Sequence, residues 1–223
     1  MLKGVIFDLD GTLADTLPVC FAAFRHAFRE MTGRVYTDEE ITALFGPSEE
    51  GSILHVAPDR SEECLHLFLA EYERAHGECR EPFPGIIEAL SLLEENGVQT
   101  AIVTGKGAHS AAISLRVLAL DPYFTLVESG SVHGPIKPQA IGRVLAKWNL
   151  SAEEVVYVGD TPSDVVSARE AGVLPLSAAW AGTADYSALQ AMSPEAIFRT
   201  VPDFTAWLRN RLQERTTPQP PPS

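Results

Sequence analysis

The chain has 223 residues, of which 45% are hydrophobic and 21% charged, as is ordinary for a globular protein that has room for a core and a smaller insert. Its formal net charge of -13 argues against nonspecific nucleic-acid binding, which needs a basic face, but allows a small anionic substrate. No apolar run approaches the roughly 20 residues of a membrane span, no signal peptide is recognisable, and three cysteines without CxxC spacing favour reduced thiols. We therefore expect a cytoplasmic protein with neither a nucleic-acid nor a membrane partner, of unknown oligomeric state.

The first part of the chain predicts one buried strand followed by helices. Residues 4–9 (GVIFDL) are apolar and β-branched, which favours a short buried strand. Apolar side chains then recur at helical spacing over 17–31, the segment 37–46 opens with a capping box, and a third helix ends near Gly77. Between the second and third of these helices, residues 46–50 (GPSEE) are predicted to form a loop.

After the proline-rich break at 81–85 (EPFPG), strands and helices alternate. This rhythm predicts a mostly parallel sheet with helices on both faces. We expect strands at 99–103, 124–128, 155–158, 173–176 and 196–201, and helices at 84–96, 108–119, 138–147, 162–171 and 203–213.

The predicted fold class is therefore α/β, with a Rossmann-like parallel sheet as the core and an inserted all-helical cap domain. The core comprises residues 1–15 and 83–213, the cap comprises 16–82, and the proline-rich tail 214–223 is predicted to be disordered. An insert of this length in the first strand–helix connection is far longer than the roughly 2–6 residues usual there. Its position suggests a cap over the edge of the sheet where such folds bind ligands.

Polar side chains follow several of the predicted strands. They come from four separate segments, which a parallel sheet brings to the same carboxyl edge. These residues are Asp8, Asp10, Thr104, Lys137, Asp160 and Asp164.

The combination of acids, a hydroxyl and a lysine is suited to phosphoryl transfer. Asp8 and Asp160 offer the oxygen ligands that Mg²⁺ prefers. A carboxylate such as Asp8 can attack phosphorus to form an aspartyl-phosphate, with Asp10 as the acid that protonates the leaving oxygen and then activates water. Lys137 would supply positive charge, and Thr104 a hydrogen bond, to the phosphoryl oxygens.

The motifs DLDGTLADT, IVTG, KP and VGDTPSD, in that order, resemble those of the haloacid dehalogenase superfamily of phosphatases, and the helical insert resembles its C1 cap. The resemblance covers about residues 3–180. It implies a HAD-like fold, a nucleophile, an acid/base, two phosphate binders, and Mg²⁺ on two carboxylates and one backbone carbonyl. The implied residues are Asp8 as nucleophile and ligand, Asp10 as acid/base and carbonyl ligand, Thr104 and Lys137 as phosphate binders, Asp160 as ligand, and Asp164 as a second acid that orders the metal or Lys137.

Within the superfamily, the second aspartate of the first motif disfavours a dehalogenase. The absence of lysine from residues 15–82 disfavours a phosphonatase and weakens a sugar phosphomutase. The motifs are most similar to the phosphoglycolate-phosphatase-like branch. They imply a Mg²⁺-dependent phosphatase that hydrolyses a small phosphorylated metabolite, a phosphoglycolate-like phosphomonoester, through an aspartyl-phosphate. The alternatives are a pyrophosphatase or a sugar phosphomutase of the same superfamily and, outside the enzymes, an inactive binding module.

Three alternatives concern individual segments. The acids Asp8 and Asp10 are also compatible with a solvated Asp-Gly turn at the end of a strand. Residues 105–110 imitate a dinucleotide-binding GxGxxG motif but lack its last glycine; Gly105 is instead expected to help bind the phosphate through backbone N–H groups. In the predicted loop 46–50, Ser48 and Glu49 are candidates for substrate specificity if the loop faces the core.

Overall fold

A computed structural model describes residues 1–213. The predicted disordered tail, 214–223, lies outside the described residues. The fold is built on one parallel sheet of six strands in the order β3-β2-β1-β4-β5-β6, which confirms the predicted fold class. The strands are β1 (Gly4–Phe7), β2 (Gln99–Val103), β3 (Leu126–Glu128), β4 (Val155–Gly159), β5 (Leu174–Ala178) and β6 (Ala196–Phe198).

The register of the central strands decides which loops meet. β1 lies between β2 and β4, with Phe7 opposite Ile102 on one side and Val158 on the other. Because all three strands run in the same direction, the residues that follow them emerge side by side at one edge. That edge therefore carries Asp8, Thr104 and Asp160.

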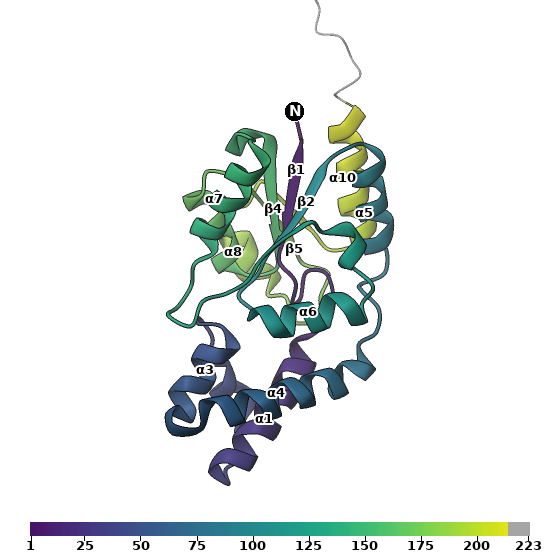
Figure 1. The fold of residues 1–223 in the computed structure, drawn as a ribbon. Helices are drawn as coiled ribbons and strands as arrows, with labels where there is room; N and C mark the ends of the chain where they lie inside the picture. Colours follow the sequence, from purple (N-terminus) through teal and green to yellow (C-terminus); the bar gives the residue numbers. More distant parts are fainter. Residues whose placement is uncertain (214–223) are drawn as a thin grey trace, which may run out of the picture.

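Helices cover both faces of the sheet (Figure 1). Alternate residues of β1 point to opposite faces of the sheet. Val5 and Phe7 join one hydrophobic cluster with α5 (Ile86–Glu95) and α10 (Val201–Gln213). Ile6 joins another with α7 (Lys137–Trp148) and α8 (Pro162–Glu170). The helix α6 (Ala108–Val117) lies between the sheet and the helices that the chain forms between β1 and α5. The helices of this part are α5 (Ile86–Glu95), α6 (Ala108–Val117), α7 (Lys137–Trp148), α8 (Pro162–Glu170), α9 (Tyr186–Ala191) and α10 (Val201–Gln213).

The segment between β1 and α5 forms a group of helices below the sheet edge in Figure 1, and its hydrophobic cluster also takes in Ile113 of α6. In this cluster the ring centroids of Phe24 and Phe68 lie 4.6 Å apart, which joins the first helix to the last. The chain returns to the sheet at Phe83, whose N–H donates to the Leu13 carbonyl at 2.9 Å. We call these the inserted helices: α1 (Leu17–Thr32), α2 (Asp38–Thr42), α3 (Glu49–Val56) and α4 (Ser61–Ala75).

The structure corrects the sequence analysis in a few places. The segment predicted as a loop at 46–50 contains the start of α3, with Ser48 as the N-cap and two glutamates in the first turn. Acids at this position favour a helix through its dipole, but a glycine in the first turn and weak amphipathicity obscured the pattern. The helix α2 ends at Thr42 instead of Gly46, and α9 was not predicted.

In the described part of the chain, no helix is both long and apolar enough to cross a membrane. The cytoplasmic location stays a prediction.

Candidate active site

A cavity of about 450 Å³ opens between the carboxyl edge of the sheet and the inserted helices. This is within the roughly 300–1,000 Å³ typical of small-molecule sites. Asp164 and Ser48 are buried but do not line it. The candidate site residues that do line it are Asp8, Asp10, Glu49, Thr104, Gly105, Lys137 and Asp160.

Asp8 follows β1 directly, is buried, and lines the cavity. The N–H of Leu9 donates to Asp8 Oδ1 at 2.7 Å, and Lys137 Nζ donates to Oδ2 at 2.6 Å. Burial raises the pKa of Asp8 to about 6; the charge of Lys137 opposes the rise and that of Asp164 adds to it. Both carboxylate oxygens are thus held in fixed directions, as a positioned nucleophile requires.

Asp160 follows β4 and lies beside the turn that leaves β1. The hydroxyl of Thr12 donates to Asp160 Oδ1 at 3.0 Å. Gly11 has φ +71°, and a Cβ there would collide with the Asp160 carboxylate, so the glycine of the first motif permits this close approach. Burial raises the pKa of Asp160 to about 8, with the charges of Asp164 and Asp8 adding to the rise. The site therefore carries more negative charge than its own side chains neutralise.

Asp164 is bound on all sides at the start of α8. Thr161 forms a capping box with it and donates to Oδ2 from its N–H at 3.0 Å and from its hydroxyl at 2.7 Å. Lys137 Nζ donates to Oδ1 at 2.6 Å and the hydroxyl of Tyr157 does so at 3.1 Å. Burial disfavours the charged form, but Lys137 and these hydrogen bonds outweigh it and hold the pKa of Asp164 below its ordinary value.

Lys137 is the first residue of α7 and joins Asp8 to Asp164. Burial disfavours its charge, but the two carboxylates outweigh this and raise the pKa of Lys137 above its ordinary value. The proline after it occupies one of the first two positions of the helix, where a missing N–H costs nothing. The KP motif thus begins a helix and aims a permanent cation at Asp8.

Asp10 contacts a different set of partners from the other acids. Its carboxylate accepts a hydrogen bond from the hydroxyl of Thr16 and lies 3.4 Å from Lys106 Nζ. Thr104 is buried at the end of β2, and its hydroxyl accepts from the Lys106 N–H at 3.3 Å. The two members of the DLD pair therefore face different lysines.

The contact between Lys106 and Glu49 was missed by the sequence reasoning. Lys106 Nζ lies 3.1 Å from Glu49 Oε1 and 4.5 Å from the centre of the Tyr72 ring. The Glu49 carboxylate also accepts from the N–H of Gly107 and, at 2.7 Å, from the hydroxyl of Ser110. Lys106 belongs to residues 105–110, which imitate a GxGxxG motif, and nothing in the local pattern pairs this lysine with an acid 57 residues earlier.

Ser48 holds the start of α3 against the core. Its N–H donates to the Ser131 carbonyl at 2.8 Å, and a Cβ at Gly51 would collide with the Val132 carbonyl. The side chain of Ser48 is buried in this contact. A direct role for Ser48 in substrate specificity stays a prediction.

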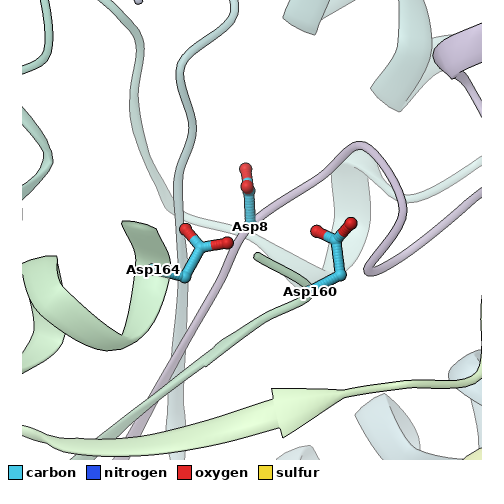
Figure 2. A group of neighbouring side chains, drawn as sticks. All are labelled: Asp8, Asp160 and Asp164. Atoms are coloured by element: carbon cyan, nitrogen blue, oxygen red, sulfur yellow. The ribbon is translucent and has the colours of Figure 1, made fainter. Parts of the chain in front are cut away.

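Three carboxylates form the candidate metal centre (Figure 2). Asp8, Asp160 and Asp164 each offer an oxygen atom, and these atoms lie within 4.8 Å of one another. Asp164 is already saturated with hydrogen bonds, whereas Thr12 contacts only one oxygen of Asp160. Buried oxygen ligands with excess negative charge are a donor set that suits Mg²⁺.

The comparisons with known proteins show the family of this chain. Residues 5–177 match the family model described as haloacid dehalogenase-like hydrolase. The chain belongs to this family. It is therefore a hydrolase of the haloacid dehalogenase superfamily, as the motifs implied.

Relatives within the family cover nearly the whole chain. The pyrophosphatase PpaX of Halalkalibacterium halodurans is 28% identical over 91% of this chain and 95% of its own length. The haloacid dehalogenase-like hydrolase from Streptococcus pneumoniae is 26% identical, with a TM-score of 0.75 over 93% of this chain and 98% of that structure. CbbY from Rhodobacter sphaeroides, solved with phosphate, has a TM-score of 0.76 at 17% identity over 90% of this chain and 95% of that one, which shows the shared fold.

Proposed function

We propose that this hydrolase is a Mg²⁺-dependent phosphatase that hydrolyses a small phosphorylated metabolite through an aspartyl-phosphate on Asp8. The observation that carries the proposal is the placement of Asp8. It lines the cavity, held by Lys137 and the Leu9 N–H, with two further buried acids beside it. Several relatives are named as pyrophosphatases, which supports chemistry at phosphorus.

In the first half of the reaction, an Asp8 carboxylate oxygen attacks the phosphorus atom. The bond between phosphorus and the ester oxygen breaks, and the leaving oxygen takes a proton from Asp10. General acid catalysis of this kind contributes about 10²–10⁴-fold. The products of this half are the free alcohol and the phosphorylated Asp8.

In the second half, Asp10 takes a proton from a water molecule as that water attacks the phosphorus. The bond between phosphorus and the Asp8 oxygen breaks, which releases phosphate and restores the carboxylate. Asp10 thereby regains the proton that it gave in the first half, so the cycle closes without another proton donor.

The remaining residues position charge. Lys137, Thr104 and the backbone N–H of Gly105 would bind the phosphoryl oxygens, because all three line the cavity near Asp8. Asp8, Asp160 and the backbone carbonyl of Asp10 would hold the Mg²⁺. The metal supplies positive charge against the phosphoryl group. Asp164 would act indirectly by fixing Lys137.

Two other enzyme activities remain alternatives within this chemistry. A pyrophosphatase is favoured by the names of the relatives, and a sugar phosphomutase is less favoured because residues 15–82 contain no lysine. Outside the enzymes, a binding module would bind phosphate compounds without turnover. The filled set of acids, lysine and hydroxyl argues against the binding module.

Substitution of the nucleophile tests the proposal. Asp8→Asn should lower turnover of p-nitrophenyl phosphate with Mg²⁺ by at least about 10⁴-fold, because no nucleophile remains. The matched control is Asp59→Asn, the same substitution at an exposed residue among the inserted helices, which should keep wild-type activity. Acid trapping of the phosphoenzyme should label Asp8. Wild-type activity in Asp8→Asn, or a label elsewhere, would refute the mechanism; no turnover by the wild type would favour the binding module.

A further inference from the structure

The cavity has two unlike sides. The side formed by the sheet edge carries the acids and lysines described above. The inserted helices contribute only one charged side chain, Glu49, and one hydroxyl, Ser52, which already donates to the Leu44 carbonyl at 2.9 Å. The rest of that side, completed by one residue of the core, is apolar: Leu17, Cys20, Phe24, Phe45, Pro47 and Ile136.

Phe45 is the most accessible part of this apolar side. It is 41% exposed, although large apolar side chains usually lie inside. Its ring stacks on Phe21, with centroids 5.9 Å apart and planes 7° from parallel, and lies 6.4 Å from Phe24. Phe45 is thus a preformed aromatic surface that faces the cavity and loses little freedom when a ligand contacts it.

Glu49 occupies the place where a second anion would bind. The start of α6 offers the Gly107 N–H, the Ser110 hydroxyl and the neighbouring Lys106 ammonium, a combination that attracts carboxylates and phosphates. The carboxylate of Glu49 already accepts from the first two and lies 3.1 Å from the third. The protein has therefore supplied its own anion to this position.

The cations that line the cavity are both engaged. Lys137 lies 2.6 Å from Asp8 and from Asp164, and Lys106 lies within 3.4 Å of both Asp10 and Glu49. Over residues 1–213, the part that the structure describes, no arginine lines the cavity. A second anionic group on a substrate would have to compete with two carboxylates for Lys106 and would be repelled by them.

We propose that this site selects phosphomonoesters whose leaving group is apolar and carries no second anionic group. Glu49 excludes the second anion, and Phe45 contacts the apolar group. The inference rests on the proposed phosphatase function and narrows it: phosphoglycolate, which carries a carboxylate, and pyrophosphate, which carries a second phosphate, become poor substrates.

Four substrates test the wild-type protein with Mg²⁺ by release of inorganic phosphate: benzyl phosphate, ethyl phosphate, 2-phosphoglycolate and pyrophosphate. Ethyl phosphate and 2-phosphoglycolate differ by a methyl group in place of the carboxylate, so their ratio isolates the second anion. Benzyl and ethyl phosphate differ by the aromatic ring, so their ratio isolates the apolar side. We expect kcat/KM to rise at least about tenfold from 2-phosphoglycolate to ethyl phosphate and again to benzyl phosphate. Pyrophosphate should be the poorest or equal to 2-phosphoglycolate.

Two variants assign the roles. Glu49→Gln should raise the ratio of kcat/KM for 2-phosphoglycolate to that for ethyl phosphate about tenfold, because one of the two repelling carboxylates at Lys106 is removed. Its control is Glu62→Gln, the same substitution on the exposed face of α4. Phe45→Ala should lower the ratio for benzyl to ethyl phosphate about tenfold. Its control is Leu54→Ala, an exposed apolar residue of α3 that does not line the cavity.

The outcomes distinguish a failure of the proposed substrate selection from a failure of the proposed phosphatase function. If the wild type prefers 2-phosphoglycolate or pyrophosphate, the selection is refuted and the phosphatase function stands. If none of the four releases phosphate while p-nitrophenyl phosphate is hydrolysed, the selection is refuted and the phosphatase function stands; if p-nitrophenyl phosphate is not hydrolysed either, the phosphatase function is refuted. An unchanged anion ratio in Glu49→Gln contradicts the role of Glu49. Phe45 is 41% exposed, so we expect Phe45→Ala to fold, and this variant keeps the proposal testable even where Glu49→Gln does not fold.

Discussion

Two lysines line the same cavity, each between two carboxylates, but their surroundings differ. Lys137 is 2.6 Å from both Asp8 and Asp164 and donates a hydrogen bond to each, and all three residues belong to the sheet and its covering helices. Lys106 is 3.4 Å from Asp10 and 3.1 Å from Glu49, and its Nζ makes no hydrogen bond. Glu49 belongs to the inserted helices.

The two clusters of ion pairs differ in which parts of the fold they join. The Lys137 cluster is held within one hydrophobic core, so its distances are set when the sheet forms. The Lys106 cluster joins the edge of the sheet to the inserted helices, whose hydrophobic cluster also takes in Ile113 of α6, so its distances depend on how the inserted helices pack against α6. Looser ion pairs of this kind are the ones that a movement of the inserted helices would break. Lysines and carboxylates thus form a fixed cluster within the core at Lys137, and a junction between the core and the inserted helices at Lys106.

Substitution of each lysine should lower the stability of the protein by a different amount. Lys137→Met leaves Asp8 and Asp164 buried without a cation, and we expect the free energy of unfolding to fall by about 3–5 kcal/mol. Lys106→Met should cost less, because Glu49 keeps the donors at Gly107 and Ser110. Urea unfolding without Mg²⁺ measures both. Equal losses would mean that the two clusters are equally important to the fold.

Substitution of the acid at the junction should affect rate more than stability. Asp10→Asn should slow both formation and hydrolysis of the aspartyl-phosphate by about 10²–10⁴-fold, since the proton donor and acceptor is lost. Rapid-quench kinetics of the phosphoenzyme resolve the two steps. A variant in which only one half-reaction is slow would assign the other proton transfer to a different group.

Substitution of Asp160 should have the smallest effect, which is a change in how the stability of the protein depends on pH. The folded-state pKa of Asp160, about 8, lies above its ordinary value of 3.8, so the folded protein keeps a proton that the unfolded chain loses. Stability from this group is therefore full below about pH 4 and is lost as the pH rises toward 8. Asp160→Asn should raise the Tm at pH 8 without Mg²⁺, by about 2–4 °C for each kcal/mol recovered.

Thermal unfolding at pH 4 and pH 8, with EDTA and with Mg²⁺, checks this prediction. The gain in Asp160→Asn should vanish at pH 4, and the rise in Tm that Mg²⁺ gives the wild type should be lost in the variant. A variant less stable than the wild type at pH 8 without metal would show that hydrogen bonding, not uncompensated charge, dominates at Asp160.

Much of the fold was predictable from local patterns. The strand at 99–103 has the predicted bounds, and the capping box at Thr37 and Glu40 starts a helix as expected. Patterns fail where periodicity is weak: α3 has a glycine in its first turn, and the six residues of α9 are too few to show a helical face. The end of β1 at Phe7 was also missed, because the turn at Gly11 draws the chain away.

The sequence by itself determined that Asp8, Thr104 and Asp160 follow parallel strands, and parallel strands present their ends at one edge. That inference needs only the alternation of strands and helices, which is written locally in the chain. Only the tertiary structure decided that Asp10 and Asp8 face different lysines and that Glu49 fills the donors at the start of α6. Such pairings depend on how an inserted group of helices packs against the sheet, and no periodicity or turn signal specifies which buried acid meets which cation.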